Sequence, residues 1–495
     1  MNLLIPTTSK RTQRLLYVGF ALIMAVLFDI FFWKQQLGVS FLLFVLIYLF
    51  GLISIAILHK QFNNRLSLFL LIPILVLSAD VVLYNNQLVK VGVPFFVAIL
   101  LIIFTILVSL KNPLKHPFHF SNIPLYSDFI LPLKKLKDIY RDLFQWNTAE
   151  TKKDIFRKIF TGVLIAVPIL FVFGLLFAQA DVVFSNIMTN FFNIQITPSV
   201  TEWIFRSGRV LVLSGLLGSL LYFIFSEEHS LRNFIKDVSK LDHIVVGVIL
   251  ALVNILFLIF VFIQIKYLFG SNNFVMQNGL TFADYARSGF FELAWVVALA
   301  AGLVAVILRS YAHHGAPTIT KVLQIILILQ VGVVAISALR RMHLYQVEYG
   351  FTTLRLYVEW FIYFVMLILT SMIVAIIAKR SFREYVYFVE ITGLVALTIV
   401  CSVNIDRLIA KENVDRYIIE HKELDLLYLD KLSYDAIPEI TRAINYGLTP
   451  ELINLQVWHK DTYLAQKKEA ILKKYDSWRS LNFGVVQVLN TINGN

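Results

Sequence analysis

The stretch LGVSFLLFVLIYLFGLISIAIL, residues 37–58, contains no charged side chain. A helix needs about 20 mostly apolar residues to cross about 30 Å of hydrocarbon, so this stretch is long enough to span a membrane. Similar runs recur along the chain. The whole sequence has 58% hydrophobic residues, 42 Phe and a mean hydropathy of +0.74, which lies outside the range of soluble globular proteins. The sequence therefore predicts an integral membrane protein.

Runs of this kind predict an all-α polytopic transmembrane bundle of about 11 spans. The first run follows Lys10, Arg11 and Arg14 and so resembles a signal peptide. Its length, its lack of a small-residue cleavage site and the spans that follow favour a retained first helix. The predicted spans cover residues 15–33, 37–58, 66–84, 91–110, 155–177, 203–225, 244–265, 288–308, 319–339, 354–378 and 385–403.

The distribution of lysine and arginine predicts the orientation of these spans. With the N-terminus in the cytoplasm, the inner segments hold 23 basic residues and the outer segments before the tail hold 9. Positively charged loops are retained in the cytoplasm. The sequence thus predicts a cytoplasmic N-terminus and, because the number of spans is odd, an extracytoplasmic C-terminus.

The net charge of +12 does not indicate nucleic-acid binding, because the excess lies in the membrane part. The region 404–495 has 12 basic and 13 acidic residues. The richest basic segment is the predicted cytoplasmic loop 111–154, where lysines alternate with apolar residues. We expect an amphipathic helix there that contacts anionic lipid; an ordinary topogenic loop and a docking site for a cytoplasmic partner are the alternatives.

Two domains are predicted: a transmembrane bundle over residues 1–403 and a small helical extracytoplasmic region over 404–495. The second region has no apolar run long enough to span, and its apolar residues recur at helical spacing. Ser433 is a candidate helix start and Gly447 a candidate helix end. An envelope protein partner could bind through this region.

No catalytic motif of a known kind is present: the sequence lacks a P-loop, a Rossmann glycine motif, HExxH and GxSxG. We therefore predict no catalytic residue and no cofactor. His116 with His119, and His313 with His314, lack partners at metal-ligand spacing and are interpreted as solvated loop residues, so no metal is predicted. The single cysteine, Cys401, is assigned to packing.

Ionisable residues in or near the spans are more informative, because an unpaired charge in a membrane is costly and usually faces a polar interior. On the predicted topology, nearly all of them fall at the outer ends of their helices, with Glu390 as the exception. This pattern predicts an outward-facing polar cavity or a polar seat for the C-terminal region. Asp29 and Asp80 are interpreted mainly as solvated at the interface. The candidate ligand or structural cluster comprises Asp181, Arg206, Arg209, Asp284, Arg287, Glu292, Arg340, Arg341, Arg355 and Glu359.

Helical spacing suggests two pairs within this cluster, Asp284 with Arg287 and Arg355 with Glu359. Glu292 is turned away from Arg287, so its partner is expected on another helix; Arg206, Arg209, Arg340, Arg341 and Arg355 are the candidates. The carboxylates are either structural ion pairs or ligand contacts, and both interpretations stay open. The arginines either reach the interface as snorkelling side chains or clamp an anionic headgroup.

Several stretches resemble a bacterial family of polytopic membrane proteins. They are QADVVFS (179–185), TFADYARSGFFELAWVV (281–297), YGFTTLRLYVEWF (349–361), LDLLYLDKLSYDAIPEI (424–440) and DSWRSLN (476–482). The family is a domain of unknown function numbered four-one-seven-three, related to the one numbered four-one-five-three. The resemblance runs from the fifth predicted span to the end. It implies a many-helix membrane protein with a helical C-terminal region and supplies no activity.

Three function classes fit these observations. The first is an envelope sensor or scaffold that binds a partner and has an outward-facing polar cavity. The second is a transporter or lipid-handling protein that uses this cavity, and the third is a membrane enzyme acting on a lipid-linked substrate. The absence of catalytic motifs favours the first class. The expected location is the bacterial cytoplasmic membrane.

Overall fold

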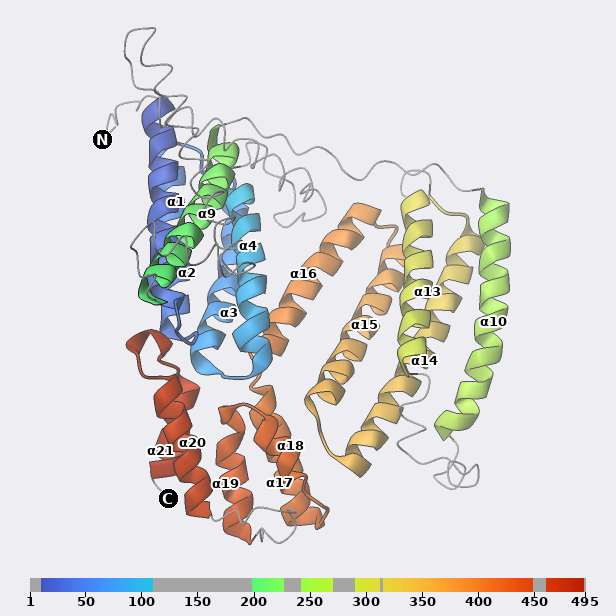
Figure 1. Cartoon of the computed structure of the whole chain (residues 1–495). Helices are drawn as coiled ribbons and strands as arrows, with labels where there is room; N and C mark the ends of the chain where they lie inside the picture. Colours follow the sequence, from blue (N-terminus) through green and yellow to red (C-terminus); the bar gives the residue numbers. More distant parts are fainter. Residues whose placement is uncertain are drawn as a thin grey trace, which may run out of the picture. The chain divides into compact units, whose positions relative to one another are not determined.

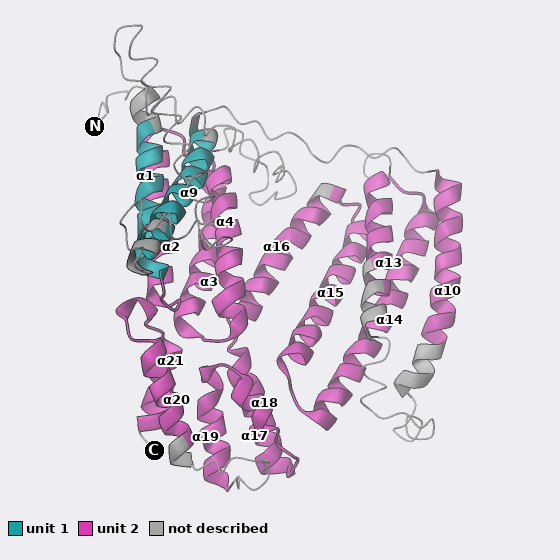
Figure 2. Cartoon of the chain, viewed as in Figure 1, with its two compact units in different colours: residues 1–33, 125–228 teal, residues 34–124, 229–495 magenta. Residues whose placement is uncertain are grey.

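The computed structural model describes residues 10–109, 198–226, 242–269, 290–311, 315–447 and 460–493. Every regular element in these ranges is helical (Figure 1). The chain divides into two compact units, shown in Figure 2: residues 1–33 with 125–228, and residues 34–124 with 229–495.

Within the described ranges, eight helices are long and apolar enough to cross a membrane. They coincide with eight of the predicted spans, including the third, which contains Pro73 and Asp80. The predicted all-α polytopic bundle is therefore confirmed. The eight segments are Leu15–Phe32, Val39–Leu58, Arg65–Leu83, Leu88–Ser109, His243–Phe262, Thr318–Tyr349, Thr353–Ile377 and Glu384–Cys401.

The other three predicted spans have different outcomes. Residues 155–177 lie outside the described ranges, as does the basic loop 111–154. The prediction at 203–225 falls within helix α9 (Pro198–Ser226). The prediction at 288–308 falls on helix α13 (Phe290–Ser310), of which Leu299–Ser310 forms a shorter apolar segment.

The first unit pairs α1 (Lys10–Phe32) with α9 along their lengths. The rings of Tyr17 and Phe225 stack with their centroids 5.3 Å apart. Gly218 lies against Ala21, since a Cβ added to the glycine would stand 3.5 Å from the alanine Cβ. Small residues at a helix contact allow the two backbones to approach closely.

The membrane part of the second unit consists of two groups of helices. The first comprises α2 (Val39–Leu58), a 3₁₀ turn η1 (Arg65–Leu70), α3 (Leu71–Leu83), a π-helical turn η2 (Leu88–Gly92) and α4 (Val93–Ser109). The second comprises α10 (His243–Phe269), α13, α14 (Thr318–Tyr349), α15 (Thr353–Ile377) and α16 (Phe382–Cys401). Helix α14 contacts α10, α13 and α15, while α16 contacts both α15 and α3.

The C-terminal region is helical, as predicted, and has its own apolar core. Its elements are α17 (Ile405–Glu420), α18 (Leu426–Lys431), η4 (Tyr434–Ala436), α19 (Ile437–Tyr446), α20 (Lys460–Lys474), η6 (Trp478–Ser480) and α21 (Phe483–Asn493). Val414, Ile440 and Ile471 are among the buried residues of this core. Asn404 caps α17 by accepting a hydrogen bond from the backbone N–H of Arg407.

The predicted domain boundary at residue 403 falls between α16 and α17, and both helices belong to the second compact unit. In Figure 1 the helices α17 to α21 gather at one end of α3 and α16. Contacts of α21 with α3, η6 with α2, and α17 with α15 join the C-terminal region to the membrane helices.

Candidate functional site

The structure places the predicted cluster residues in several different environments. Asp181, Asp284 and Arg287 lie outside the described ranges. Glu292 is on α13, in the part of that helix whose side chains are not described. The predicted pair of Asp284 with Arg287 and the partner of Glu292 therefore remain predictions.

Arg206 and Arg209 of α9 meet Asp29 of α1. Arg206 Nε donates to Asp29 Oδ2 at 2.7 Å, and Arg209 forms an ion pair with the other carboxylate oxygen. The guanidinium carbons lie 4.6 Å from the ring centroid of Trp203 and 4.1 Å from that of Trp33, respectively. Asp29 is only 7% exposed. Its interpretation as a solvated interface residue is thus wrong, because two arginines from a distant segment enclose it.

Arg340 and Arg341 lie near the C-terminal end of α14, where Arg340 is exposed and Arg341 is half-buried. Arg355 lies in the first turn of α15 and donates from Nη1 to the carbonyl oxygens of Tyr349 at 3.1 Å and Gly350 at 2.5 Å. Its guanidinium carbon also lies 4.0 Å from the ring centroid of Tyr345. Arg355 therefore holds the loop between α14 and α15.

Glu359 has other partners than the predicted Arg355. Its Oε2 accepts from Gln346 Nε2 at 2.8 Å, and its Oε1 accepts from the hydroxyl of Tyr363 at 3.2 Å. The expected pair of Arg355 with Glu359 is absent from the ion pairs of the described residues. Spacing places the two side chains on one helix face, but the carbonyl groups of the adjacent loop take up the guanidinium instead.

The loop between α14 and α15 is fixed by the C-terminal region. Asn413 of α17 accepts from Phe351 N and donates to Phe351 O, both at 2.8 Å. Arg416 Nη2 donates to Val347 O at 2.6 Å. Gly350 ends α14 with φ +79°, and a Cβ there would stand 2.5 Å from Asn413 Oδ1. The loop therefore requires glycine both for its backbone angle and for the close approach of α17.

A pocket of about 300 Å³ lies between α15 and α17, next to this loop. Glu359, one of the predicted cluster residues, lies in its lining. A second carboxylate, Glu412 of α17, was not in the predicted cluster. The lining residues are Phe351, Leu356, Glu359, Trp360, Tyr363, Leu408, Ile409 and Glu412.

A second attachment joins the C-terminal region to the turn between α3 and η2. Asn482 Nδ2 donates to the carbonyl oxygens of Val81 at 3.0 Å and Tyr84 at 3.1 Å. Asn85 N donates to Asp435 Oδ2 at 2.7 Å, and the hydroxyl of Tyr475 donates to Asn85 Oδ1 at 2.9 Å.

Two residues of this second attachment, Asp435 and Asn482, are buried from solvent, and Asn85 and Tyr475 are half-buried. Asp435 is 2% exposed and Asn482 is 1% exposed. Burial raises the pKa of Asp435 to about 6. Nearby, Lys90 Nζ donates to Leu37 O at 2.6 Å and Val81 O at 3.0 Å. Asp80 is 3% exposed and accepts from Ser402 Oγ at 2.7 Å, so its interpretation as a solvated interface residue is also wrong.

These attachment residues were missed from the sequence because most of them are uncharged or lie outside the spans. A signal was nevertheless present. Asn482 ends the quoted stretch DSWRSLN, Asp435 lies in LDLLYLDKLSYDAIPEI, and Phe351 lies in YGFTTLRLYVEWF. Three of the quoted stretches therefore contain a residue that attaches the C-terminal region.

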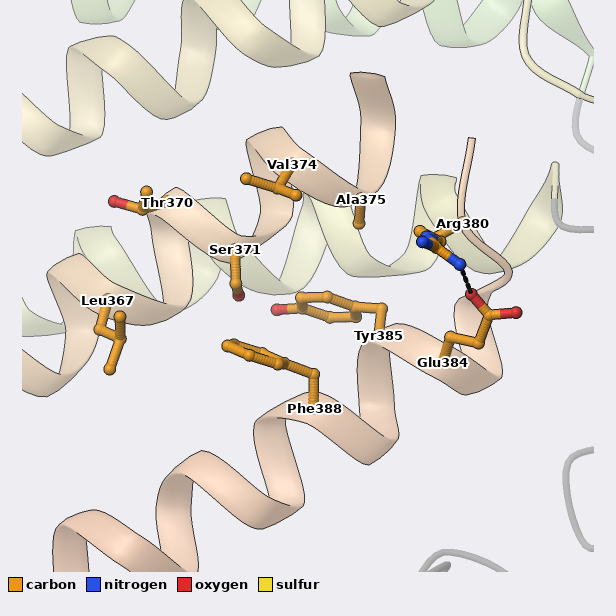
Figure 3. A pocket seen from close by; sticks show the side chains of 9 residues that line it. All are labelled: Leu367, Thr370, Ser371, Val374, Ala375, Arg380, Glu384, Tyr385 and Phe388. Carbon is orange, nitrogen blue, oxygen red and sulfur yellow. Dashed lines mark hydrogen bonds and ion pairs between the residues drawn. The ribbon is translucent and has the colours of Figure 1, made fainter. Parts of the chain in front are cut away.

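A larger pocket of about 430 Å³ lies between the C-terminal part of α15 and the N-terminal part of α16 (Figure 3). Figure 3 shows Tyr385 and Phe388 of α16 opposite Ser371 and Val374 of α15. At its edge, Arg380 and Glu384 form an exposed ion pair with an N–O distance of 3.5 Å. The charges of Arg380 and Glu384 thus neutralise each other, whereas the lining of the smaller pocket has two carboxylates and no cation.

The described residues contain no group of three or more His, Cys, Asp and Glu that could hold a metal ion. The four histidines considered from the sequence lie outside the described ranges. Cys401 is fully buried.

These features define a multi-pass helical membrane protein whose C-terminal helices are attached to its membrane helices. The chain belongs to the family described as Domain of unknown function (DUF4153), which it matches over residues 18–443. This family is the one related to the family that the quoted stretches resemble. The match begins inside the first span, includes the next three spans and ends within α19, so it does not extend over DSWRSLN (476–482). No curated protein and no solved structure matches the chain.

Proposed function

We propose that the protein is an envelope scaffold or sensor of the bacterial cytoplasmic membrane. Its N-terminus is cytoplasmic, and its C-terminal region, residues 404–495, lies on the outer side and binds an envelope protein. The observation that carries this proposal is the double attachment of the region, to the turn between α3 and η2 and to the loop between α14 and α15.

The chemistry of the attachments supports a fixed arrangement. Each one joins side chains of the C-terminal region to backbone groups at helix ends. Any other docking would leave these buried groups unpaired, at about 1–3 kcal/mol for each. A region held in this way keeps its orientation relative to the helices that it contacts. A scaffold needs such rigidity to present a surface, and a sensor needs it to pass a movement to the membrane.

The charge distribution supports the orientation. The attachments involve the ends of α3, α14 and α15 that the positive-inside count assigns to the outer side. The basic loop 111–154 would then lie on the cytoplasmic side, where it is expected to contact anionic lipid.

Reporter fusions test the orientation. Fusions after Arg383 and after Asn404 should report opposite sides of the membrane, inside for the first and outside for the second. Equal signals from the two fusions would overturn the proposed topology.

Site-specific photo-crosslinking in cells tests the partner. Ile419 of α17 is 72% exposed, and Tyr446 of α19 is 54% exposed. A crosslinker at these positions should trap the same envelope protein, and Asn482→Ala should reduce the yield without loss of membrane insertion. No adduct at either position, or an adduct that Asn482→Ala leaves unchanged, would contradict the proposal.

The second candidate is a transporter or lipid-handling protein. It is favoured by the pocket beside Glu359 and by two amide side chains that donate to backbone carbonyl groups between the spans of α10 and α14. Asn254 Nδ2 of α10 donates to Leu323 O of α14 at 3.0 Å, and Gln330 Nε2 donates to Asn254 O at 3.2 Å. Solute flux or lipid translocation in proteoliposomes that Glu359→Gln abolishes would favour this candidate over the first.

A further inference from the structure

We propose that the pocket between α15 and α17 binds an organic ammonium group, supplied either by the headgroup of an aminophospholipid or by a free amine. This inference adds a ligand to the proposed function. It rests on the proposed function in one respect, namely that the pocket faces the outer side of the membrane. Binding by the purified protein can be measured independently of that side.

The walls of the pocket are suited to a cation with carbon substituents. Phe351, Trp360 and Tyr363 line it together with the aliphatic side chains of Leu356, Leu408 and Ile409. The face of an aromatic ring attracts a cation within about 6 Å of its centroid, and several rings together recognise alkylated ammonium groups. The aliphatic residues can contact the carbon atoms of such a ligand.

The charge of Glu359 is not neutralised by a cation among the described residues. Its two hydrogen-bond donors, the amide of Gln346 and the hydroxyl of Tyr363, are both neutral. An ionised carboxylate has about four acceptor positions, so these two bonds orient Glu359 and leave it able to accept from an ammonium group. An N⁺–H donor bound to a carboxylate forms a stronger hydrogen bond than a neutral donor does.

Glu412 adds a second negative charge from α17. It is half-buried and forms no ion pair within the described ranges. Three arginines of the neighbouring turns have other partners: Arg355 donates to Gly350 O, Arg416 donates to Val347 O in the last turn of α14, and Arg407 pairs with Glu439 at 3.6 Å. The pocket therefore combines two carboxylates with three aromatic rings.

A metal ion fits this lining less well than an ammonium group. Calcium takes about 6 to 8 oxygen ligands and magnesium about six, whereas the pocket supplies two carboxylates among mostly apolar neighbours. Its volume of about 300 Å³ is at the lower end of the range for small-molecule sites. An ethanolamine group, whose ammonium has N–H donors, is of suitable size.

The position of the pocket makes both sources of the ammonium group accessible. Glu359 lies in the second turn of α15, near the start of the span Thr353–Ile377. The headgroups of a bilayer lie at the ends of its spanning helices. A lipid could enter from the bilayer and a free amine from the water.

The experiment uses the full-length protein in nanodiscs. In discs of phosphatidylglycerol alone, methylammonium and ethanolamine are titrated calorimetrically. In discs that also contain phosphatidylethanolamine, the lipids retained by the protein are identified by native mass spectrometry. Saturable binding of a free amine at one site supports the free-amine source. Selective retention of phosphatidylethanolamine supports the lipid source. Binding of neither, or binding of calcium with no ammonium binding, overturns the proposal.

Variants locate the binding to this pocket. Glu359→Gln, Glu412→Gln and Trp360→Leu should each weaken binding by about tenfold. Glu423→Gln, which changes an exposed carboxylate outside the pocket lining, should leave the affinity unchanged. Glu412→Gln removes no hydrogen bond among the described residues. If Glu359→Gln fails to fold, Glu412→Gln therefore still tests whether the ammonium group binds in this pocket. Unchanged affinity in Glu412→Gln and Trp360→Leu would overturn the proposal.

The proposed function can fail while this inference holds. A cytoplasmic location of the pocket, or the absence of an envelope partner, would leave ammonium binding in nanodiscs intact. Loss of ammonium binding would in turn leave the crosslinked partner and the reporter signals unchanged.

Discussion

Two carboxylates that share a position near a helix end have opposite surroundings in the folded protein. Asp29 of the first unit is enclosed by Arg206 and Arg209, whose guanidinium groups also lie over tryptophan rings. Glu359 of the second unit accepts, among the described residues, from an amide and a hydroxyl, and it faces a pocket.

The difference separates a charge that stabilises the fold from a charge that is available to a ligand. Two cations neutralise Asp29, so its removal leaves them without their carboxylate. Neutral donors hold Glu359 in place without reducing its charge. Whether such a carboxylate has a structural or a ligand-binding role therefore depends on the charge of its hydrogen-bond donors and on whether it faces a cavity. Its position near a helix end does not distinguish the two roles.

The largest effect is expected from Asp29→Asn. The substitution removes a carboxylate that is 7% exposed and leaves the two arginines around it without that counter-charge, and it should lower the free energy of unfolding by about 3 kcal/mol. The matched Glu359→Gln should change it by less than about 1 kcal/mol, because only neutral partners are affected. Unfolding in mixed micelles by a denaturing detergent measures both. Equal losses would remove the distinction between the two carboxylates.

A comparable effect, confined to the C-terminal region, is expected from Asn482→Ala. The substitution removes hydrogen bonds to two carbonyl groups and the cap that Asn482 Oδ1 provides to Val485 N at 3.0 Å. The attachment should weaken by about 2–3 kcal/mol. Hydrogen exchange of α21 should then rise strongly, whereas Asn490→Ala, on the exposed side of the same helix, serves as the control. Similar exchange rates in both variants would show that the attachment is not a stabilising one.

A smaller effect is expected from Gly350→Ala, which acts on the loop beside the pocket. With φ at +79° and Asn413 Oδ1 2.5 Å from the added Cβ, the substitution should cost about 2 kcal/mol. Gly315→Ala is the matched control, since its φ is +68° and nothing lies within 4 Å of its Cβ. The control isolates the backbone cost, so thermal unfolding should show a greater loss for Gly350→Ala. Equal losses of stability in the two variants would show that the close approach of α17 to Gly350 adds nothing to the cost of the substitution.

The smallest effect concerns pH and a third carboxylate, Asp435, which burial keeps from ionising at its ordinary pKa. Its pKa rises from 3.8 to about 6, so the folded protein binds a proton more tightly than the unfolded chain does. The contribution of Asp435 to stability is therefore present below about pH 4 and is lost as the pH rises through about 6.

Asp435→Asn should remove this slope and raise stability at pH 7 by about 1 kcal/mol. Limited proteolysis of the C-terminal region between pH 4 and 7 measures the slope in the wild type and the variant. The opposite result would be a wild-type protein that becomes more resistant to proteolysis as the pH rises from 4 to 7, with no such change in Asp435→Asn. That result would show that ionised Asp435 stabilises the folded protein, and it would contradict the raised pKa.

Much of the fold could be predicted from the sequence, because the length and hydropathy of each span are local properties. The stretch 37–58 became α2, and the third span was retained despite Pro73 and Asp80. The pairs of charges could not be predicted in the same way. Arg355 and Glu359 have the spacing of a pair, yet loop carbonyls and Gln346 are their partners.

The sequence by itself determined that this is a multi-pass helical membrane protein with a helical C-terminal region and charges near its helix ends. Hydrophobic length and helical period determine these properties within single segments. Only the tertiary structure decided that Asp29 is enclosed by arginines from α9, that Asn482 and Asp435 attach the C-terminal region, and that Glu359 faces a pocket with Glu412. Each of these contacts joins residues far apart in the chain, and their pairing depends on how whole helices pack.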